Sequence, residues 1–228
     1  MAEQAGKSSP IPPADITPSP VPALHVSRMT WPQGMTLHRI HQAKYAGAEF
    51  NPGVKGNARF SPIMDAQGRR IPTLYGGSSF DCAAMETVFH DVSFAPGFKS
   101  YDKTKLEGHV HSQVQPGVDL VLADLRGKAL RKLGISRRQL IDTEKDRYPA
   151  TRKWAQAIHA RCPDVQGLCW TSRQDDSAQA AMLFGDRIAA DVLSQTGPSR
   201  SLLKDENAYD DVLNLAEKIG VNLVSGKN

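Results

Sequence analysis

Hydrophobic residues repeat with helical spacing in three parts of the chain. The first repeat predicts a helix over 79–92, capped by the serine at its start, with Glu86 at the edge of the apolar stripe. A second helix is expected to begin at Pro149, a residue that suits the first helical turn. The third repeat spans 209–219 and predicts a last helix that Gly220 ends.

Short apolar runs between turn residues predict strands. They occupy 37–41, 70–75, 118–125, 167–171 and 181–184. The run at 118–125 is almost continuously apolar, which is typical of a central strand, and two glycines are expected to close the strand at 70–75. Because the strands are short and the helices irregularly interleaved, we expect an α+β fold with mixed short-stranded sheets, not a doubly wound parallel sheet.

Proline is concentrated at the start of the chain. Residues 1–24 contain six prolines and no apolar periodicity, so we expect a disordered or extended arm there. The rest is predicted to form one domain over 25–224, with 225–228 as a short tail. A chain of 228 residues that is 40% hydrophobic can bury a substantial core.

The overall charge and the cysteines bear on the partners and the cellular compartment of the protein. A net charge of +4 favours anionic partners without choosing among nucleotides, nucleic acids and acidic proteins. The three cysteines form no CxxC pair and no even disulfide framework, which favours a reducing compartment. No apolar run approaches the ~18 residues of a membrane span, and the first residues lack the pattern of a secretory signal. We therefore expect a cytoplasmic protein without membrane contact.

Two arginines and a tyrosine are candidates for ligand binding. Arg39 lies in a short apolar segment, so it is either a surface charge on an edge strand or a guanidinium that binds a phosphate bidentately. Arg59, between an alanine and a phenylalanine, allows the same two interpretations. Tyr75 precedes two glycines and is either a core residue or a ring that stacks on a nicotinamide or ribose.

A glutamate and a distant serine are candidates for catalysis. Glu86 either pairs with His90 one helical turn away or stabilises positive charge on a sugar carbon during glycosidic cleavage. Ser172 follows a predicted strand and is either an ordinary turn serine or a donor to a phosphate oxygen. No GxGxxG or phosphate-loop motif accompanies these residues.

Histidines and a basic run suggest weaker alternatives. His109 and His111 share one face of a segment, but no third ligand is spaced to complete a metal site, so we expect solvated histidines and no bound metal. Six cations without an acid lie over 126–138. They are either a solvated face or a contact for nucleic acid or an acidic protein, which makes a non-enzymatic binding module the alternative function. A nuclease is a third hypothesis, weakened by the lack of clustered acidic ligands.

In their order along the chain, these residues resemble the RES-domain family, named for an arginine, a glutamate and a serine. The resemblance covers about 36–187 and is carried by the segments 37–40, 56–60, 74–86 and 167–184. Carried over residue by residue, Arg39, Glu86 and Ser172 are the name-giving trio, and Arg59 and Tyr75 are further pocket residues. Which of the two arginines is essential stays open. Gly76 and Gly77 depart from the bulkier apolar residues that the family pattern has after the tyrosine.

The resemblance implies a fold similar to ADP-ribosyltransferases of the diphtheria-toxin kind. It implies NAD as substrate, with no cofactor, and a toxin-like activity that breaks the nicotinamide–ribose bond. Water, phosphate or a protein would then accept the ADP-ribose. It also implies a small helix-turn-helix antitoxin protein as partner, and a protein target if the reaction is a transfer. Direct binding to nucleic acid is not expected of such an enzyme.

Overall fold

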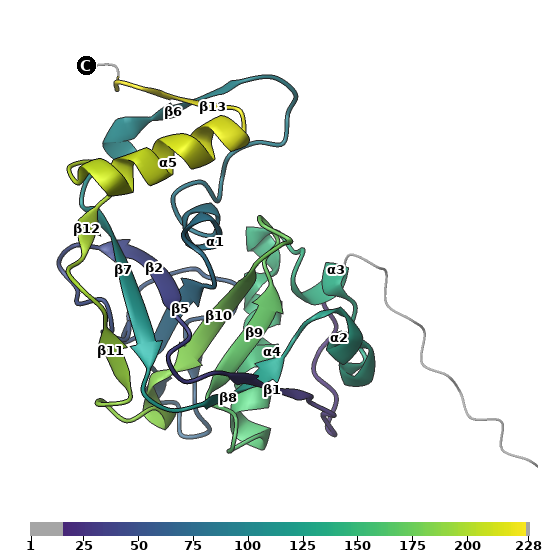
Figure 1. Cartoon of the computed structure of the whole chain (residues 1–228). Coiled ribbons are helices and arrows are strands. Elements are labelled where there is room, and N and C mark those ends of the chain that lie inside the picture. Colours follow the sequence, from purple (N-terminus) through teal and green to yellow (C-terminus); the bar gives the residue numbers. More distant parts are fainter. Residues whose placement is uncertain (1–15, 227–228) are drawn as a thin grey trace, which may run out of the picture.

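A mixed sheet of nine strands forms the centre of the protein, for which a computed structural model describes residues 16–226 (Figure 1). Its order is β1 (Arg28–Trp31), β8 (Leu120–Asp124), β9 (Gly167–Thr171), β10 (Gln179–Phe184), β5 (Thr73–Gly77), β2 (Leu37–Gln42), β7 (His109–Pro116) and β11 (Leu193–Gln195), with β12 (Arg200–Ser201) also on β7. In this sheet β8 and β9 run parallel and the other pairs antiparallel. The α+β prediction is therefore confirmed. The segment predicted as a central strand, β8, lies one strand from the edge.

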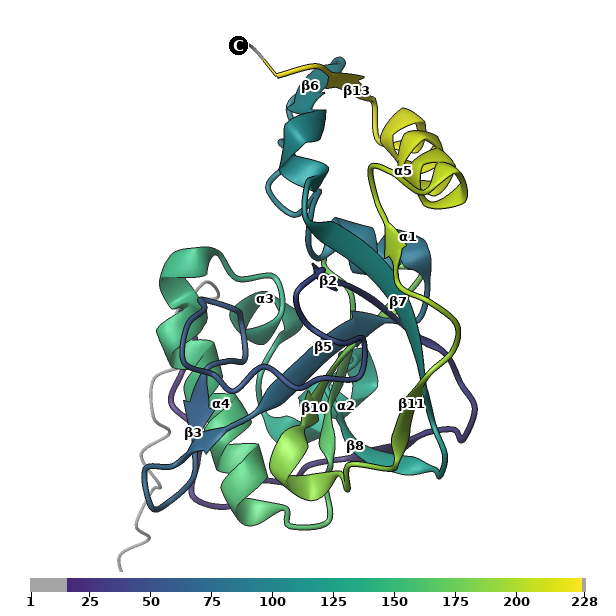
Figure 2. The same ribbon diagram turned by 90° about the vertical axis from the view of Figure 1, so that its left-hand side faces the viewer.

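Helix α4 (Tyr148–Arg161) packs against one face of this sheet (Figure 2). Its buried Trp154 and Ile158 belong to the same apolar cluster as Leu168 and Trp170 of β9, whereas Cys169 between them packs on the opposite face. This alternation follows from the two-residue period of a strand. The short helices α2 (Gly127–Leu133) and α3 (Arg137–Leu140) border the same cluster.

A second, smaller layer lies beyond the end of the sheet, where Figure 1 shows α5 above α1. It contains α1 (Phe80–Met85), α5 (Glu206–Lys218), and a parallel pair of β6 (Lys99–Asp102) and β13 (Val221–Val224), with the 3-10 helix η1 (Lys103–Leu106) after β6. The remaining elements are the hairpin of β3 (Ile63–Met64) and β4 (Arg70–Ile71) and the 3-10 helices η2 (Lys145–Arg147) and η3 (Gly185–Arg187). Among residues 16–226 no helix is long and apolar enough to cross a membrane.

Helix α1 is shorter than its apolar repeat predicts. Ser79 caps it as expected, accepting a hydrogen bond from the backbone of Cys82 at 3.0 Å, but the helix ends at Met85 instead of Val92. The Thr87 hydroxyl donates to the Ala83 carbonyl at 2.6 Å, while the Thr87 backbone N–H donates to the Ala84 carbonyl at 3.2 Å, the spacing of a tighter turn. Turns follow, and Glu86 stands at the C-terminal end of α1.

The first described residues are packed against the body of the protein. The Thr17 hydroxyl donates to the Gln139 carbonyl at 2.6 Å, and the Trp154 indole donates to the Pro18 carbonyl at 2.7 Å. Residues 16–24 of the expected arm form no helix or strand, and two buried side chains, Thr17 and Trp154, hold the start of this segment against the domain. Residues 1–15 of the predicted arm and 227–228 of the tail lie outside the described residues.

The two glycines after Tyr75 continue strand β5 instead of closing it. A Cβ on Gly76 would lie 2.5 Å from Cγ of Leu37 on β2, and one on Gly77 would lie 2.8 Å from Sγ of Cys82 on α1. The departure from the family pattern thus lets a strand and a helix approach β5 closely.

His109 and His111 take different environments, contrary to the expectation of two solvated rings. His111 is buried and stacked on His38, and His38 Nδ1 and His111 Nε2 form a hydrogen bond at 3.0 Å. His109 is partly buried, and its Nδ1 has no hydrogen-bond partner among residues 16–226. Burial, together with the charges of His38, Arg200 and His41, lowers the pKa of His111 to about 3.

We expect Gly77→Ala to lower the free energy of unfolding by about 1–3 kcal/mol, because the added methyl group overpacks the contact with α1. Gly127→Ala is the matched control, since nothing lies within 4 Å of its Cβ position, and it should change stability by less than about 1 kcal/mol. Urea unfolding measures both, and equal stabilities of the two variants would contradict the close approach.

A second prediction concerns acid stability. Because the folded pKa of His111 lies below its unfolded value, this group contributes stability above pH ~6.5 that is lost as the pH falls toward 3. Between pH 7 and pH 5 the wild type should lose about 2 kcal/mol more than His111→Gln, whereas replacing the exposed His25 by glutamine should leave the loss unchanged. Parallel denaturant titrations at the two pH values test this, and identical losses would refute it.

Candidate active site

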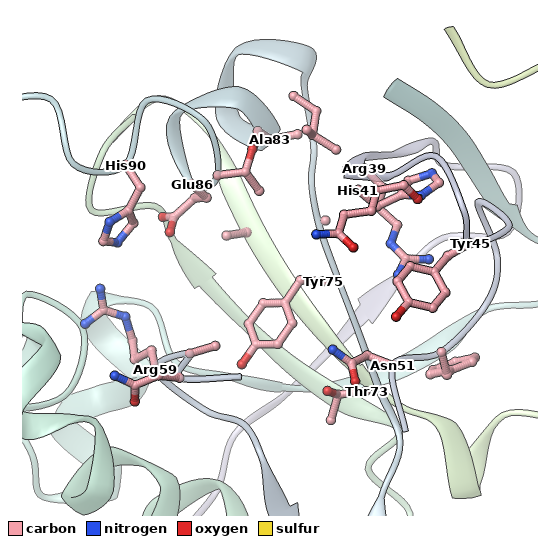
Figure 3. A pocket seen from close by; sticks show the side chains of 18 of the residues that line it. Arg39, His41, Tyr45, Asn51, Arg59, Thr73, Tyr75, Ala83, Glu86 and His90 are labelled. Carbon is pink, nitrogen blue, oxygen red and sulfur yellow. The ribbon is translucent and has the colours of Figure 1, made fainter. Parts of the chain in front are cut away.

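A cavity of about 470 Å³ opens between the end of α1, strands β2 and β5, and the start of α4. Four of the five predicted site residues line it: Arg39, Arg59, Tyr75 and Glu86. In Figure 3, Glu86 and Arg59 lie on one side of Tyr75, and Arg39 lies on the other. The sequence order that suggested one site is thus matched by proximity in the fold.

Glu86 is held by Ser172 from beneath the cavity wall. The Ser172 hydroxyl donates to Oε1 of Glu86 at 2.6 Å and accepts from the backbone N–H groups of Gln174 and Asp175 at 3.0 and 3.1 Å. Two donors on its oxygen leave its single hydrogen for the carboxylate. Ser172 is fully buried and does not line the cavity, so its hydroxyl is not directed at a ligand phosphate as the sequence suggested.

The alternative interpretation of Glu86, a helical pair with His90, does not occur. The helix ends before Glu86, and His90 Nδ1 instead lies 2.7 Å from Oδ1 of Asp91. Asp91 also accepts from Lys145 at 2.7 Å. These groups line the cavity beside Glu86, whose second carboxylate oxygen has no hydrogen-bond partner among residues 16–226.

Arg39 is a buried residue of an interior strand and not a surface charge. Arg39 is 8% exposed, and its Nη1 donates to the carbonyls of Gly47 and Glu49, each at 2.7 Å. Burial lowers the pKa of Arg39 to about 10, while Glu49 raises it, so the group is cationic at neutral pH. The guanidinium therefore fixes the loop at 46–49 and keeps other nitrogens that form no bond with residues 16–226.

Arg59 occupies the side of the cavity near Glu86. It is 5% exposed, its Nη1 donates to the Thr143 carbonyl and hydroxyl at 3.1 and 2.7 Å, and its guanidinium lies 5.2 Å from the ring centroid of Tyr148. Burial lowers the pKa of Arg59, and the nearby Tyr148 and Glu86 raise it. The cation is thus fixed by stacking and hydrogen bonding within electrostatic range of the carboxylate.

Tyr75 separates the two sides of the cavity (Figure 3). Its ring meets Trp170 edge to face, with the centroids 6.3 Å apart, and its hydroxyl accepts from the backbone of Phe60 at 3.2 Å. Burial raises the pKa of Tyr75, so the phenol stays protonated. An aromatic surface in this position suits stacking against a flat ring or a sugar.

Several lining residues were not predicted from the sequence. They are His41, Tyr45, Asn51, Asp91, Lys145 and Tyr148. The Lys145–Tyr148 segment reaches the cavity because α4 begins there, and no local motif marks it. Conversely, no cation of the run 126–138 lines the cavity. Arg126 pairs with Asp124 and Arg137 with Asp142, and the other four cations are exposed.

Comparison with known proteins gives the family of the chain. A family model described as the RES domain matches residues 36–205, a span that contains all five candidate residues. No curated protein matches the chain. The family is associated with NAD-related toxin–antitoxin systems and is generally linked to enzymes that act on NAD. Because the match covers most of the chain, the protein belongs to the RES domain family.

Proposed function

We propose that the cavity binds NAD and that the enzyme breaks the bond between nicotinamide and ribose. The observation that carries this proposal is the Glu86 carboxylate, fixed by the Ser172 hydroxyl at 2.6 Å on the wall of a cavity that also holds two buried arginines. A volume of about 470 Å³ lies in the range of small-molecule sites.

The carboxylate suits the charge that develops in this reaction. As the C1″–N1 bond breaks, its electron pair enters the pyridinium ring and neutral nicotinamide leaves, while positive charge grows on the ribosyl carbon. A carboxylate already held in place stabilises that charge without rearranging during the step. Ser172 then acts as a positioning residue for Glu86, in place of the phosphate contact that the sequence suggested.

The arginines and the tyrosine suit the rest of the dinucleotide. Arg39 and Arg59 line the cavity and keep nitrogens without a partner among residues 16–226, and guanidinium groups bind diphosphate oxygens well. Tyr75 would pack against the nicotinamide or the ribose between them. In this arrangement both arginines contribute, with Arg59 closer to the reacting bond.

The wider setting follows from the family and remains part of the proposal. The protein would be a cytoplasmic toxin with an ADP-ribosyltransferase-like fold, using NAD as substrate without a separate cofactor and inhibited by a small helix-turn-helix antitoxin. The alternative, a non-enzymatic binding module using the exposed cations over 126–138, would be favoured by salt-dependent binding of DNA or RNA in the absence of NAD turnover.

The principal test replaces Glu86 by glutamine, which keeps its shape and removes its charge. We expect release of nicotinamide from NAD to fall about 100-fold, the usual effect of losing one preorganised electrostatic partner. Glu107→Gln is the control, because Glu107 is exposed and does not line the cavity. Chromatographic measurement of nicotinamide decides the matter: equal rates in wild type and Glu86→Gln would sink the proposal.

A further test separates positioning from binding at Ser172. Ser172→Ala removes one hydrogen bond to a charged group, so kcat should fall about tenfold while KM for NAD stays nearly constant. Thermal unfolding of the variant establishes that it is folded at the assay temperature. A raised KM with an unchanged kcat would instead assign Ser172 to substrate binding.

A further inference from the structure

A second cavity of about 600 Å³ adjoins the first. The two share the stretch Ile40–Gln42 of β2, together with Thr87 and Asp91 after α1. The far wall of the second cavity comes from β6, η1 and the start of β7. A segment seated there therefore lies next to the residues that line both cavities, whereas Glu86 lines the first cavity alone.

The second cavity is cationic. Lys99 and Lys105 line it, and neither forms an ion pair with any residue of 16–226. The carboxylate in its lining, Asp91, is already engaged by Lys145 and His90, each at 2.7 Å. The Lys105 ammonium lies 5.5 Å from the ring centroid of Tyr101 and within electrostatic range of Asp102, so its charge is partly compensated. The Lys99 ammonium and, in part, that of Lys105 thus remain to attract an anionic ligand.

The inner end of this cavity offers a further polar group. His109 lines it, opposite Gln42 in the β2–β7 ladder, and its Nδ1 is buried without a partner among residues 16–226. A buried ring nitrogen in that state gains a hydrogen bond if a small rotation brings it to a ligand atom.

Size and surface character point to a polypeptide. A cavity of about 600 Å³ is far larger than water or inorganic phosphate requires. The loop between two of its lining stretches, 93–98, carries Phe94 and Phe98, which are 81% and 77% exposed. They are the most exposed large apolar residues in the described chain, and aromatic side chains of this kind anchor protein–protein contacts.

We propose that the second cavity docks an acidic segment of a protein that accepts ADP-ribose, an inference that rests on the proposed function. Lys99 and Lys105 hold carboxylates of the segment, and Phe94 and Phe98 contact its apolar residues. A carboxylate oxygen forms the new bond to C1″ as the C1″–N1 bond breaks. The electron pair of the broken bond enters the nicotinamide ring, and no proton has to move.

Binding can be measured without NAD by fluorescence anisotropy. The probes are a fluorescein-labelled peptide of alternating glutamate and phenylalanine, and its counterpart with lysine in place of glutamate. We expect the acidic peptide to bind the wild type, the basic one not to bind, and the double variant Lys99→Ala/Lys105→Ala to bind at least tenfold more weakly. Phe94→Ser/Phe98→Ser should weaken binding as well.

The matched control is Lys128→Ala/Lys132→Ala, which removes the same charge from exposed positions on α2 away from the cavity. Equal loss of binding in the two double-lysine variants would overturn the proposal, because it would reflect net charge alone. The cavity would instead be assigned to a small anion if millimolar inorganic phosphate displaces the peptide and the Phe94→Ser/Phe98→Ser variant binds the peptide as tightly as the wild type.

Transfer is followed with biotinylated NAD and the acidic peptide. Label on the peptide, lost in the Lys99→Ala/Lys105→Ala variant and retained in the control, is the expected result. Peptide binding without any nicotinamide release would leave the docking site standing and remove the proposed function. Nicotinamide release with no selective peptide binding would support the proposed function and refute the docking site.

Discussion

One hydrogen bond, from the Ser172 hydroxyl to the Glu86 carboxylate, joins the two parts of the chain on which the site depends. Ser172 sits at the end of β9, where the backbone N–H groups of Gln174 and Asp175 fix its oxygen. Glu86 stands where α1 ends early. The orientation of the acid is thus set by a strand turn 86 residues away in sequence and not by the helix that carries it.

The buried arginines serve architecture and ligand binding together. Taking a guanidinium out of water is costly unless it is paired or hydrogen-bonded. Arg39 offsets this cost with loop carbonyls, and Arg59 does so with Thr143 and the Tyr148 ring, so neither forms a direct ion pair with a carboxylate of residues 16–226. Each arginine therefore lines the cavity while it holds a neighbouring loop or helix in place.

The sequence predicted the parts of this site that depend on local pattern. The cap at Ser79, the strand around Arg39 and the helix from Pro149 follow from residue type and periodicity, and the order of arginine, glutamate and serine identified the family. The early end of α1 was not predicted, because the apolar repeat continues past Met85 and does not encode the turns that follow, in which the Thr87 hydroxyl donates to the Ala83 carbonyl. The direction of the Ser172 hydroxyl and the second cavity depend on contacts between distant segments, which periodicity does not encode.

The packed segment at the beginning of the described chain reaches the same site indirectly. Thr17 and Pro18 are bonded to α3 and α4, and α4 in turn supports Arg59, whose backbone carbonyl accepts from the Thr151 hydroxyl. Removing this segment would remove a hydrogen bond that supports α4, the helix that contacts Arg59. A shortened protein, or a fusion joined too close to Thr17, would accordingly present a loosened cleft even with every lining residue intact.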